Sequence, residues 1–222
     1  MMIIEKELKS KAITVKSFDT LVIYIYLKNI TTFGDNMTFD DYSLHDHKHR
    51  FSAWAASTAA RASRKKCHFS VEEGKKILES ADIEKSIQQI PKIKSQEKFD
   101  EWHKDMCNRL ISNAKSDHIQ GFTFGVAAKL LNCYLKSYFV DYLDELKFIH
   151  PPIDRLLLDE LAYKNIGNQE GFWKRKSKIG WSNFKEEDYS EVIKSIKEAL
   201  HKIEAGCGLW KIEYYWAGHQ SK

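Results

Sequence analysis

A lysine and an aspartate occupy positions where both could act as chemical groups. Lys129 lies in an apolar segment, residues 125–132 (GVAAKLLN), in the opening turns of an expected helix. Asp154 follows two prolines in residues 151–155 (PPIDR), where another helix is expected to begin. A desolvated amine attacks an electrophilic carbon, and a nearby carboxylate accepts its proton and stabilises positive charge. The pair therefore predicts catalysis at a carbon on which positive charge develops.

The 25 residues that separate the two groups allow them to meet. A helix that continues for about 12 residues beyond Lys129 carries the chain roughly 18 Å away, at about 1.5 Å per residue. Residues 141–153 must bring the chain back, and when extended they reach at most ~45 Å. We therefore expect Lys129 and Asp154 to face one cleft, each at the mouth of its helix.

Helical patterns cover most of the chain from residue 44 onward. Dense alanine, a serine–glutamate capping box and an amphipathic apolar stripe indicate three of the helices. The segment after residue 124 is apolar all round, which is typical of a buried central helix. The expected helices are residues 44–64, 70–80, 96–114, 124–143, 154–163, 186–203 and 209–216.

The remaining segments are expected to be irregular or are ambiguous. Residues 31–41 and 165–180 have the composition of loops, and Pro91 is expected to interrupt the chain before residue 96. Residues 15–30 are apolar and β-branched, so that periodicity leaves a buried helix and a strand equally open. The sum is an all-α protein of about eight helices, in a single domain over residues 1–222 that could divide into two helical lobes.

Composition indicates a globular protein and excludes several classes. The chain has 222 residues, of which 43% are hydrophobic and 30% charged, and a net charge of +4. This charge permits a nucleic-acid partner without requiring one. The longest apolar run, residues 21–27, is too short to cross a bilayer, and no secretory signal precedes it. The four cysteines have no metal-binding spacing, so we expect them to be reduced, in a cytoplasmic protein. We also expect a monomer.

The residues around Lys129 and Asp154 resemble the helix-hairpin-helix DNA glycosylase superfamily. Residues 125–129 (GVAAK) are similar to the end of the family's hairpin, Gly-Val-Gly-x-Lys-Thr-Ala, with Ala127 in place of the second glycine. Residues 152–154 (PID) are similar to the family's Pro-Val-Asp segment. The lysine-to-aspartate gap is closest to that of the archaeal 8-oxoguanine branch.

The resemblance implies an enzyme that flips a damaged or modified base out of double-stranded DNA and excises it. It implies Lys129 as a Schiff-base nucleophile, Asp154 as an essential carboxylate, and Gly125, Asn132 and Arg155 as contacts to DNA or base. Residues 110–165 would carry the hairpin and the catalytic segment. No cofactor and no metal are implied. An oxidised purine is the family's default substrate, while a hypermodified phage base, an antiviral defence role and lyase activity stay open.

Other aromatic and basic residues are candidates for contacts with DNA. The aromatic side chains that could sandwich a flipped base are Trp54, Phe51, Phe122, Phe124, Trp181, Trp210 and Trp216. Two basic runs could hold backbone phosphates, residues 61–66 with Arg61 and residues 174–178 with Lys174 and Arg175.

Each of these assignments has a structural alternative. Asp154 is a favoured N-cap for the helix that follows it. Lys129 shares a helical face with Gly125, Asn132 and Lys136, and such a polar stripe is often solvated. Large aromatic residues are commonly part of the core, and basic runs are commonly solvated surface.

Residues 45–49 (HDHKH) point to a different chemistry. His45 and His49 share a helical face beside Asp46, and such a group could bind a metal ion. The second hypothesis is therefore a metal-dependent nuclease or phosphohydrolase. A third is a non-catalytic helical nucleic-acid-binding module of a defence system.

Overall fold

The computed structural model describes residues 42–61 and 67–216, which form helices and turns without a β-strand. The predicted all-α class is confirmed. The chain divides into two units at Ser43, and the unit that begins at Leu44 holds all the helices described below. The ambiguous segment 15–30 and the expected loop 31–41 lie outside the described residues.

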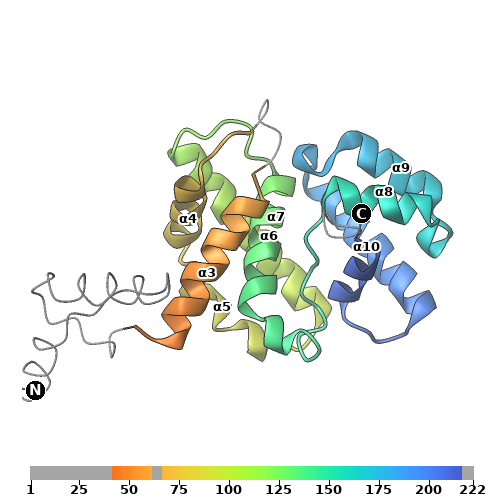
Figure 1. The fold of residues 1–222 in the computed structure, drawn as a ribbon, viewed down its shortest axis with the longest axis horizontal. Helices are drawn as coiled ribbons and strands as arrows, with labels where there is room; N and C mark the ends of the chain where they lie inside the picture. Colours follow the sequence, from red (N-terminus) through yellow and green to blue (C-terminus); the bar gives the residue numbers. More distant parts are fainter. Residues whose placement is uncertain (1–41, 62–66, 217–222) are drawn as a thin grey trace, which may run out of the picture. The chain divides into compact units, whose positions relative to one another are not determined.

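Helices α3, α4 and α5 open this unit (Figure 1). Helix α3, Leu44–Ala59, is shorter than the predicted 44–64 and packs through buried small residues on α7 and α4. Helix α4, Val71–Ser80, begins with the predicted capping box between Ser70 and Glu73. Helix α5, Ile83–Ile87, leads into the 3-10 turn η2, Ile90–Lys92, where Pro91 lies.

Helices α6 and α7 pack against each other and are joined by a short turn. Helix α6, Gln96–Ser116, is capped by Ser95, and α7, Phe124–Tyr138, is capped by Thr123. The turn between them places Gly121 at φ 69°, a left-handed conformation that glycine adopts without strain. Helix α7 is buried on nearly all sides, as its apolar sequence predicted, although it ends at Tyr138 rather than at residue 143. A second turn, η3 (Val140–Tyr142), follows it.

The chain then runs to a second group of helices, α8, α9 and α10. Helix α8, Arg155–Tyr163, starts directly after Asp154, and α10 spans Glu186–Ile203, as predicted. The 3-10 segments η4 (Ile166–Asn168), η5 (Trp181–Asn183) and η6 (Leu209–Tyr215) connect and follow these helices.

The prediction that residues 165–180 form a loop is wrong. Residues Glu170–Ile179 form helix α9, which packs against α8. Only Trp173 and Lys176 of this helix are buried, so no apolar stripe marks it in the sequence. The indole nitrogen of Trp173 donates to the Ile166 carbonyl at 2.8 Å, which fixes α9 against the preceding turn.

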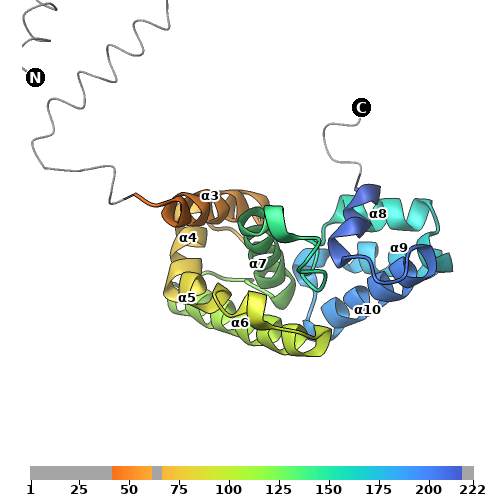
Figure 2. The same cartoon turned by 90° about the horizontal axis from the view of Figure 1, so that it is seen from below.

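Helix α7 links the two groups of helices (Figure 2). It packs against α3 and α6 in the first group, and it contacts α10 and η5 in the second. The site described below lies along this helix. Among the described helices, none combines the length and apolar character that a membrane span requires.

Candidate functional site

Lys129 and Asp154 meet in the structure. The Lys129 Nζ atom lies 3.0 Å from Asp154 Oδ2, and the exposed fractions of the two side chains are only 9% and 18%. Ordinary surface ion pairs are solvated and weak, whereas this one is held by buried elements. The convergence that the sequence spacing allowed is therefore present, while the catalytic role of the pair stays a prediction.

The two carboxylate oxygens of Asp154 have different tasks. Oδ1 accepts the backbone N–H of Leu157 at 2.9 Å, so that Asp154 is the N-cap of α8. Oδ2 accepts from Lys129 and is free of the cap. The capping alternative is correct, and it fixes the direction in which the second oxygen points.

Two tryptophans cover the Lys129–Asp154 pair. The Trp216 indole nitrogen donates to Asp154 Oδ2 at 3.1 Å. The Lys129 ammonium lies 4.8 Å from the centre of the Trp181 ring, in a cation–π contact. Trp181 and Trp216 were two of seven aromatic candidates, and they are the two that contact the pair.

A cavity of ≈ 230 Å³ opens beside the pair. Its walls come from α3, α7, the segment before α8, and the end of η6. The lining residues are Ala55, Ala59, Lys129, Cys133, Lys136, Ser137, Pro152, Asp154, Glu213 and Trp216. An apolar cavity of about 150 Å³ binds benzene, so this volume is enough for one small ring system.

The far side of this cavity carries a second charged pair. Glu213 forms an ion pair with Lys136, and burial raises the pKa of Glu213 despite that neighbour. Burial also raises the pKa of Cys133 to about 11, so that this residue is a neutral thiol near pH 7. The cavity thus presents two acid–base pairs and no thiolate.

Gly125 has a packing role. A Cβ atom at this position would lie 1.9 Å from the Trp181 carbonyl oxygen, so only glycine lets η5 approach α7 this closely. The Gly125 amide donates to the Phe184 carbonyl at 3.0 Å. Gly125 was expected to contact DNA, but its N–H group is already used in this bond. Gly125 therefore positions Trp181 over Lys129.

The polar face predicted on α7 is mostly buried. Lys129, Asn132 and Gly125 are buried, and only Lys136 is partly exposed, so the solvated-stripe alternative is wrong for three of its four members. Asn132 was expected to contact DNA, but it is fully buried and donates to the Pro151 carbonyl at 3.0 Å. It ties α7 to the segment that ends at Asp154.

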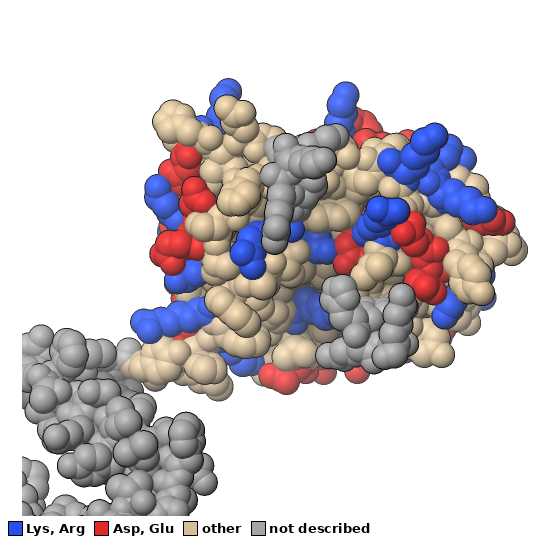
Figure 3. All heavy atoms as spheres, turned by 45° about the horizontal axis from the view of Figure 1, so that its top comes forward, with Lys and Arg blue, Asp and Glu red and all other residues tan. Residues whose placement is uncertain are grey.

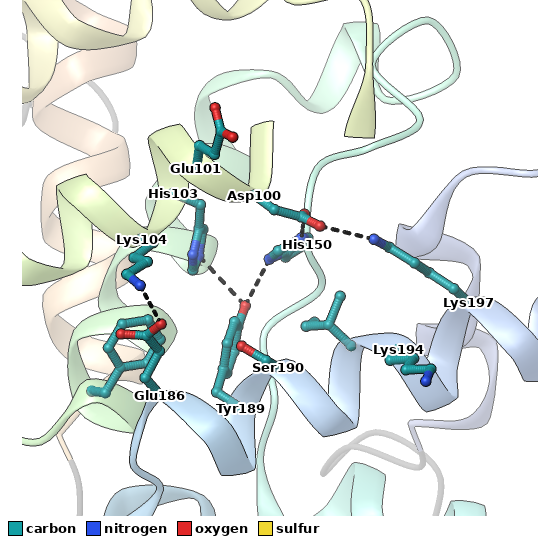
Figure 4. A pocket seen from close by; sticks show the side chains of 12 residues that line it. Asp100, Glu101, His103, Lys104, His150, Glu186, Tyr189, Ser190, Lys194 and Lys197 are labelled. Atoms are coloured by element: carbon teal, nitrogen blue, oxygen red, sulfur yellow. Dashed lines mark hydrogen bonds and ion pairs between the residues drawn. The ribbon is translucent and has the colours of Figure 1, made fainter. Parts of the chain in front are cut away.

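Asn132 belongs to a buried network that sequence reasoning missed, and Figure 4 shows its other members, His103, His150, Tyr189 and Asp100. Its side chain contacts His103 Nε2 at 2.8 Å and the Tyr189 hydroxyl at 2.8 Å. His150 extends the network from the Tyr189 hydroxyl, at 3.0 Å, to Asp100, at 2.8 Å. The network joins α6, α7, α10 and the segment before α8.

One arrangement of protons satisfies this network. The Asn132 amide donates to the Tyr189 oxygen, Tyr189 donates to His150 Nδ1, and His150 Nε2–H donates to Asp100. His103 Nε2–H donates to the Asn132 carbonyl oxygen. Both histidines are neutral in this arrangement, which agrees with their burial.

Burial and pairing set the charges in the network. Burial, followed by the charge of His150, lowers the pKa of His103 to about 3, and burial also lowers the pKa of His150. Burial alone would raise the pKa of Asp100, but the hydrogen bonds from His150, Gln96 and Lys197 outweigh it and hold the pKa well below its usual range. Asp100 is therefore the ionised end of a neutral chain.

A cavity of ≈ 410 Å³ lies beside this network. Its acidic and basic groups are largely paired with one another: Lys104 contacts Glu186 at 2.6 Å and Lys197 contacts Asp100 at 3.0 Å. Tyr189, which borders the cavity, is held in the hydrogen-bond chain. We therefore assign this region to positioning the helices rather than to chemistry.

The other predicted contacts with DNA divide between the surface and the core. Trp54 is 52% exposed on α3 and its ring lies 5.9 Å from that of Phe51. Arg61 is exposed just beyond the end of α3, and residues 62–66 are outside the described part. The Arg155 side chain is exposed and pairs with Asp159 at 3.3 Å. Phe122 and Phe124 are core residues, and Trp210 packs against the core.

The second basic run, residues 174–178, lies on helix α9. Lys174 and Arg175 are exposed, and lysine and arginine side chains gather over this part of the surface (Figure 3). Lys176 is different, because it is buried between Asp188 and Glu191 at 2.8 and 2.7 Å. Only the outer face of the run is available to a partner.

Comparison of the chain with protein-family models, curated proteins and solved structures finds no match. The function is therefore argued from the geometry of the cavity and of the groups that line it.

Proposed function

We propose that this protein is a DNA N-glycosylase that excises a damaged or modified base, with Asp154 and Lys129 as its catalytic residues. The observation that carries the proposal is the Lys129–Asp154 pair, 3.0 Å apart at the wall of a ≈ 230 Å³ cavity. Such a cavity holds one everted base, and the pair stands where the sugar carbon of that nucleotide would lie.

In the hydrolytic version of this reaction, water adds to C1′ and the C1′–N bond breaks with its electron pair moving to the base. Asp154 takes the proton of the attacking water and its charge stabilises the oxocarbenium-like sugar, and the base leaves after gaining a proton. The positive charge of Lys129 holds the Asp154 carboxylate in place through their ion pair. This version requires no covalent intermediate.

In the lyase version, the neutral Lys129 amine forms the bond to C1′ and the base leaves. The ion pair holds an ammonium, so one proton must first pass from Lys129 to Asp154 or to solvent. Opening of the sugar ring gives an iminium ion, and loss of a C2′ proton then expels the 3′ phosphate. Water finally releases the amine.

The cavity also favours a class of substrate. Trp216 offers a flat face for stacking, and Lys136 and Glu213 offer a donor and an acceptor to the edge of a base. The volume leaves little room beyond one ring system. An oxidised purine therefore fits the cavity better than a hypermodified base with a large substituent.

The test is release of bases from synthetic duplexes that carry single oxidised or modified bases, measured as alkali-labile abasic sites in buffer with EDTA. We expect release by the wild-type protein and a loss of at least about 100-fold in Asp154→Asn, because a positioned carboxylate contributes this much or more. Asparagine keeps the N-cap, and circular dichroism of the variant checks that the fold survives loss of the Lys129 ion pair. Asp159→Asn, on the exposed face of the same helix, is the matched control and keeps full activity.

Borohydride separates the two versions of the reaction. In the lyase version it reduces the iminium ion and links wild-type protein to DNA, while Lys129→Gln gives no adduct. In the hydrolytic version neither protein is trapped and Asp154→Asn is still inactive. Equal base release by wild type and Asp154→Asn, or no release from any duplex, contradicts the proposal.

A further inference from the structure

Helices α3 and α5 bring two histidines and two carboxylates together outside the proposed active site. His45 and His49 lie one turn apart on α3, and Glu84 of α5 faces both of them. His45 Nδ1 lies 3.4 Å from Glu84 Oε1, and His49 Nε2 lies 3.7 Å from Glu84 Oε2. Asp46 has a carboxylate oxygen within 4.8 Å of the ligand atoms of His45 and Glu84.

The contacts of Glu84 in this cluster are longer than hydrogen bonds, and the His45–Glu84 distance fits two atoms that share an ion. Hydrogen bonds between nitrogen and oxygen are about 2.7–3.2 Å long, so both contacts with Glu84 exceed that range. Ligand atoms around a tetrahedral zinc ion, at about 2.0–2.2 Å from the metal, lie about 3.3–3.6 Å from each other. The His45–Glu84 separation of 3.4 Å lies in this second range.

Buried aromatic residues of α7 orient both imidazole rings. His49 Nδ1 lies 2.8 Å from the hydroxyl of Tyr134, whose side chain is fully buried. With Nδ1–H donating to that oxygen, the lone pair of Nε2 points toward Glu84. The ring of His45 packs edge-on against Tyr138, with centroids 5.9 Å apart. Such outer contacts fix the tautomer and direction of metal-binding histidines.

The donor set also matches a particular ion. His45 offers one imidazole nitrogen, and Asp46 and Glu84 each offer a carboxylate oxygen, so that a water molecule would complete a four-coordinate site. Imidazole nitrogens combined with carboxylate oxygens suit four-coordinate zinc better than magnesium or calcium, which take oxygen ligands. The sequence had suggested His45, Asp46 and His49, and Glu84 is the distant ligand that only the fold reveals.

We propose that His45, Asp46 and Glu84 bind one zinc ion that joins the start of α3 to α5, with His49 as an outer contact of Glu84. None of the four residues lines the cavity that holds Lys129 and Asp154. The site is therefore independent of base excision, which proceeds in EDTA in the mechanism above.

The test uses untagged full-length protein, stripped with a chelator and then titrated with Zn²⁺ in competition with a chromophoric chelator. We expect one equivalent to bind and to raise the melting temperature. His45→Ala and Glu84→Gln should each weaken binding by more than about 100-fold, since loss of an outer-shell partner alone costs about 10–100-fold. His49→Ala, which removes an outer contact of Glu84, should fall in the about 10–100-fold range.

His47→Ala is the matched control, because it removes a histidine of the same helix turn that does not belong to the cluster. It should bind zinc with unchanged affinity. Binding of less than one equivalent, or unchanged affinity in Glu84→Gln, overturns the proposal and leaves the cluster as a set of histidine–glutamate ion pairs. Circular dichroism of each stripped variant separates loss of binding from loss of fold. Glu84→Gln is the decisive variant, because Glu84 lies on the partly exposed helix α5.

Discussion

At the scale of single residues, the proposed site depends on contacts that leave little freedom. Asp154 uses one oxygen for the helix and the other for Lys129, so its carboxylate cannot rotate without losing a cap. Lys129 is held from the opposite side by the face of Trp181. The position of Trp181 depends in turn on the absence of a side chain at Gly125.

Gly125→Ala should destabilise the protein and disturb the site. The new methyl would meet the Trp181 carbonyl, and overpacking of this kind costs about 1–3 kcal/mol or more. We expect a lower urea midpoint and slower base release, because Trp181 must move away from Lys129.

Gly171→Ala is the control for this substitution. Gly171 also lies in a helix, but a methyl there would approach nothing closer than 4.0 Å. It should stabilise the protein by about 0.4–1 kcal/mol through the unfolded chain. Equal midpoints for the two variants would show that the close approach at Gly125 does not exist in solution.

At the scale of elements, the buried network determines how α6, α7 and α10 are set against the segment before α8. Asn132 is its centre, because it contacts His103, Tyr189 and the Pro151 carbonyl. Partly satisfied buried networks are costly, whereas this one has a partner for each of these groups. The distance between Lys129 and Asp154 is consequently a property of four elements.

The network makes stability dependent on pH. The pKa of His103 is lowered to about 3 in the folded state, while a histidine in an unfolded chain titrates near ~6.5. Between these values the unfolded state binds a proton that the folded state does not, so stability falls as the pH is lowered from ~6.5 toward ~3. The lowered pKa of His150 acts in the same direction.

Urea unfolding at pH 7 and pH 5 tests this dependence. Wild type should lose up to about 1.4 kcal/mol per pH unit for each such histidine below ~6.5. His103→Gln keeps a donor for Asn132 but cannot titrate, so its stability should change less between the two pH values. His201→Gln, on the exposed face of α10, should follow wild type. Parallel curves for all three proteins would exclude His103 as the source.

The sequence predicts a helix well when a capping residue or an apolar stripe marks it. Helices α4, α7 and α8 begin at Ser70, Thr123 and Asp154, whose side chains accept backbone N–H groups. Two of these starts were visible as a capping box and as an aspartate after a proline pair. Helix α9 has no side-chain cap and buries only two residues, so its composition resembled a loop.

The sequence identified the two groups proposed to react, but it did not identify the residues that surround and position them. Lys129 and Asp154 were identifiable because a lysine in an apolar helix and an aspartate at a helix start are local features. His103, His150 and Tyr189 carry no such local signal, and their contacts join residues 39 to 86 positions apart. Glu84 was missed for the same reason. Such pairings follow from how the helices pack.

At the scale of the whole molecule, the net charge of +4 is modest, but the charged side chains are unevenly distributed over the surface. Basic side chains gather over α9 (Figure 3). Lys174 and Arg175 of this helix are exposed, whereas Lys176 is paired with two acids. If DNA binds this face, affinity should fall with salt, because each neutralised phosphate releases counterions.

Lys174→Ala combined with Arg175→Ala should weaken binding of duplex DNA for all sequences alike. The slope of log affinity against log salt should become shallower by about 2, or about one for each cation removed. Fluorescence anisotropy of a labelled duplex over a range of salt concentrations measures this slope. Lys75→Ala combined with Lys76→Ala on α4 removes the same charge from another helix and should leave the slope unchanged. If the α4 variant has the larger effect, the DNA-binding face has been misassigned.

The two indoles at the cavity give the protein an internal optical sensor. Trp181 lies under an ammonium and Trp216 donates to a carboxylate, so the emission of both responds to the charges of the groups proposed to react. Trp216 lines the cavity, so a molecule that enters it should change the surroundings of this indole. Occupancy can therefore be followed by intrinsic fluorescence, without a label and before any bond is broken.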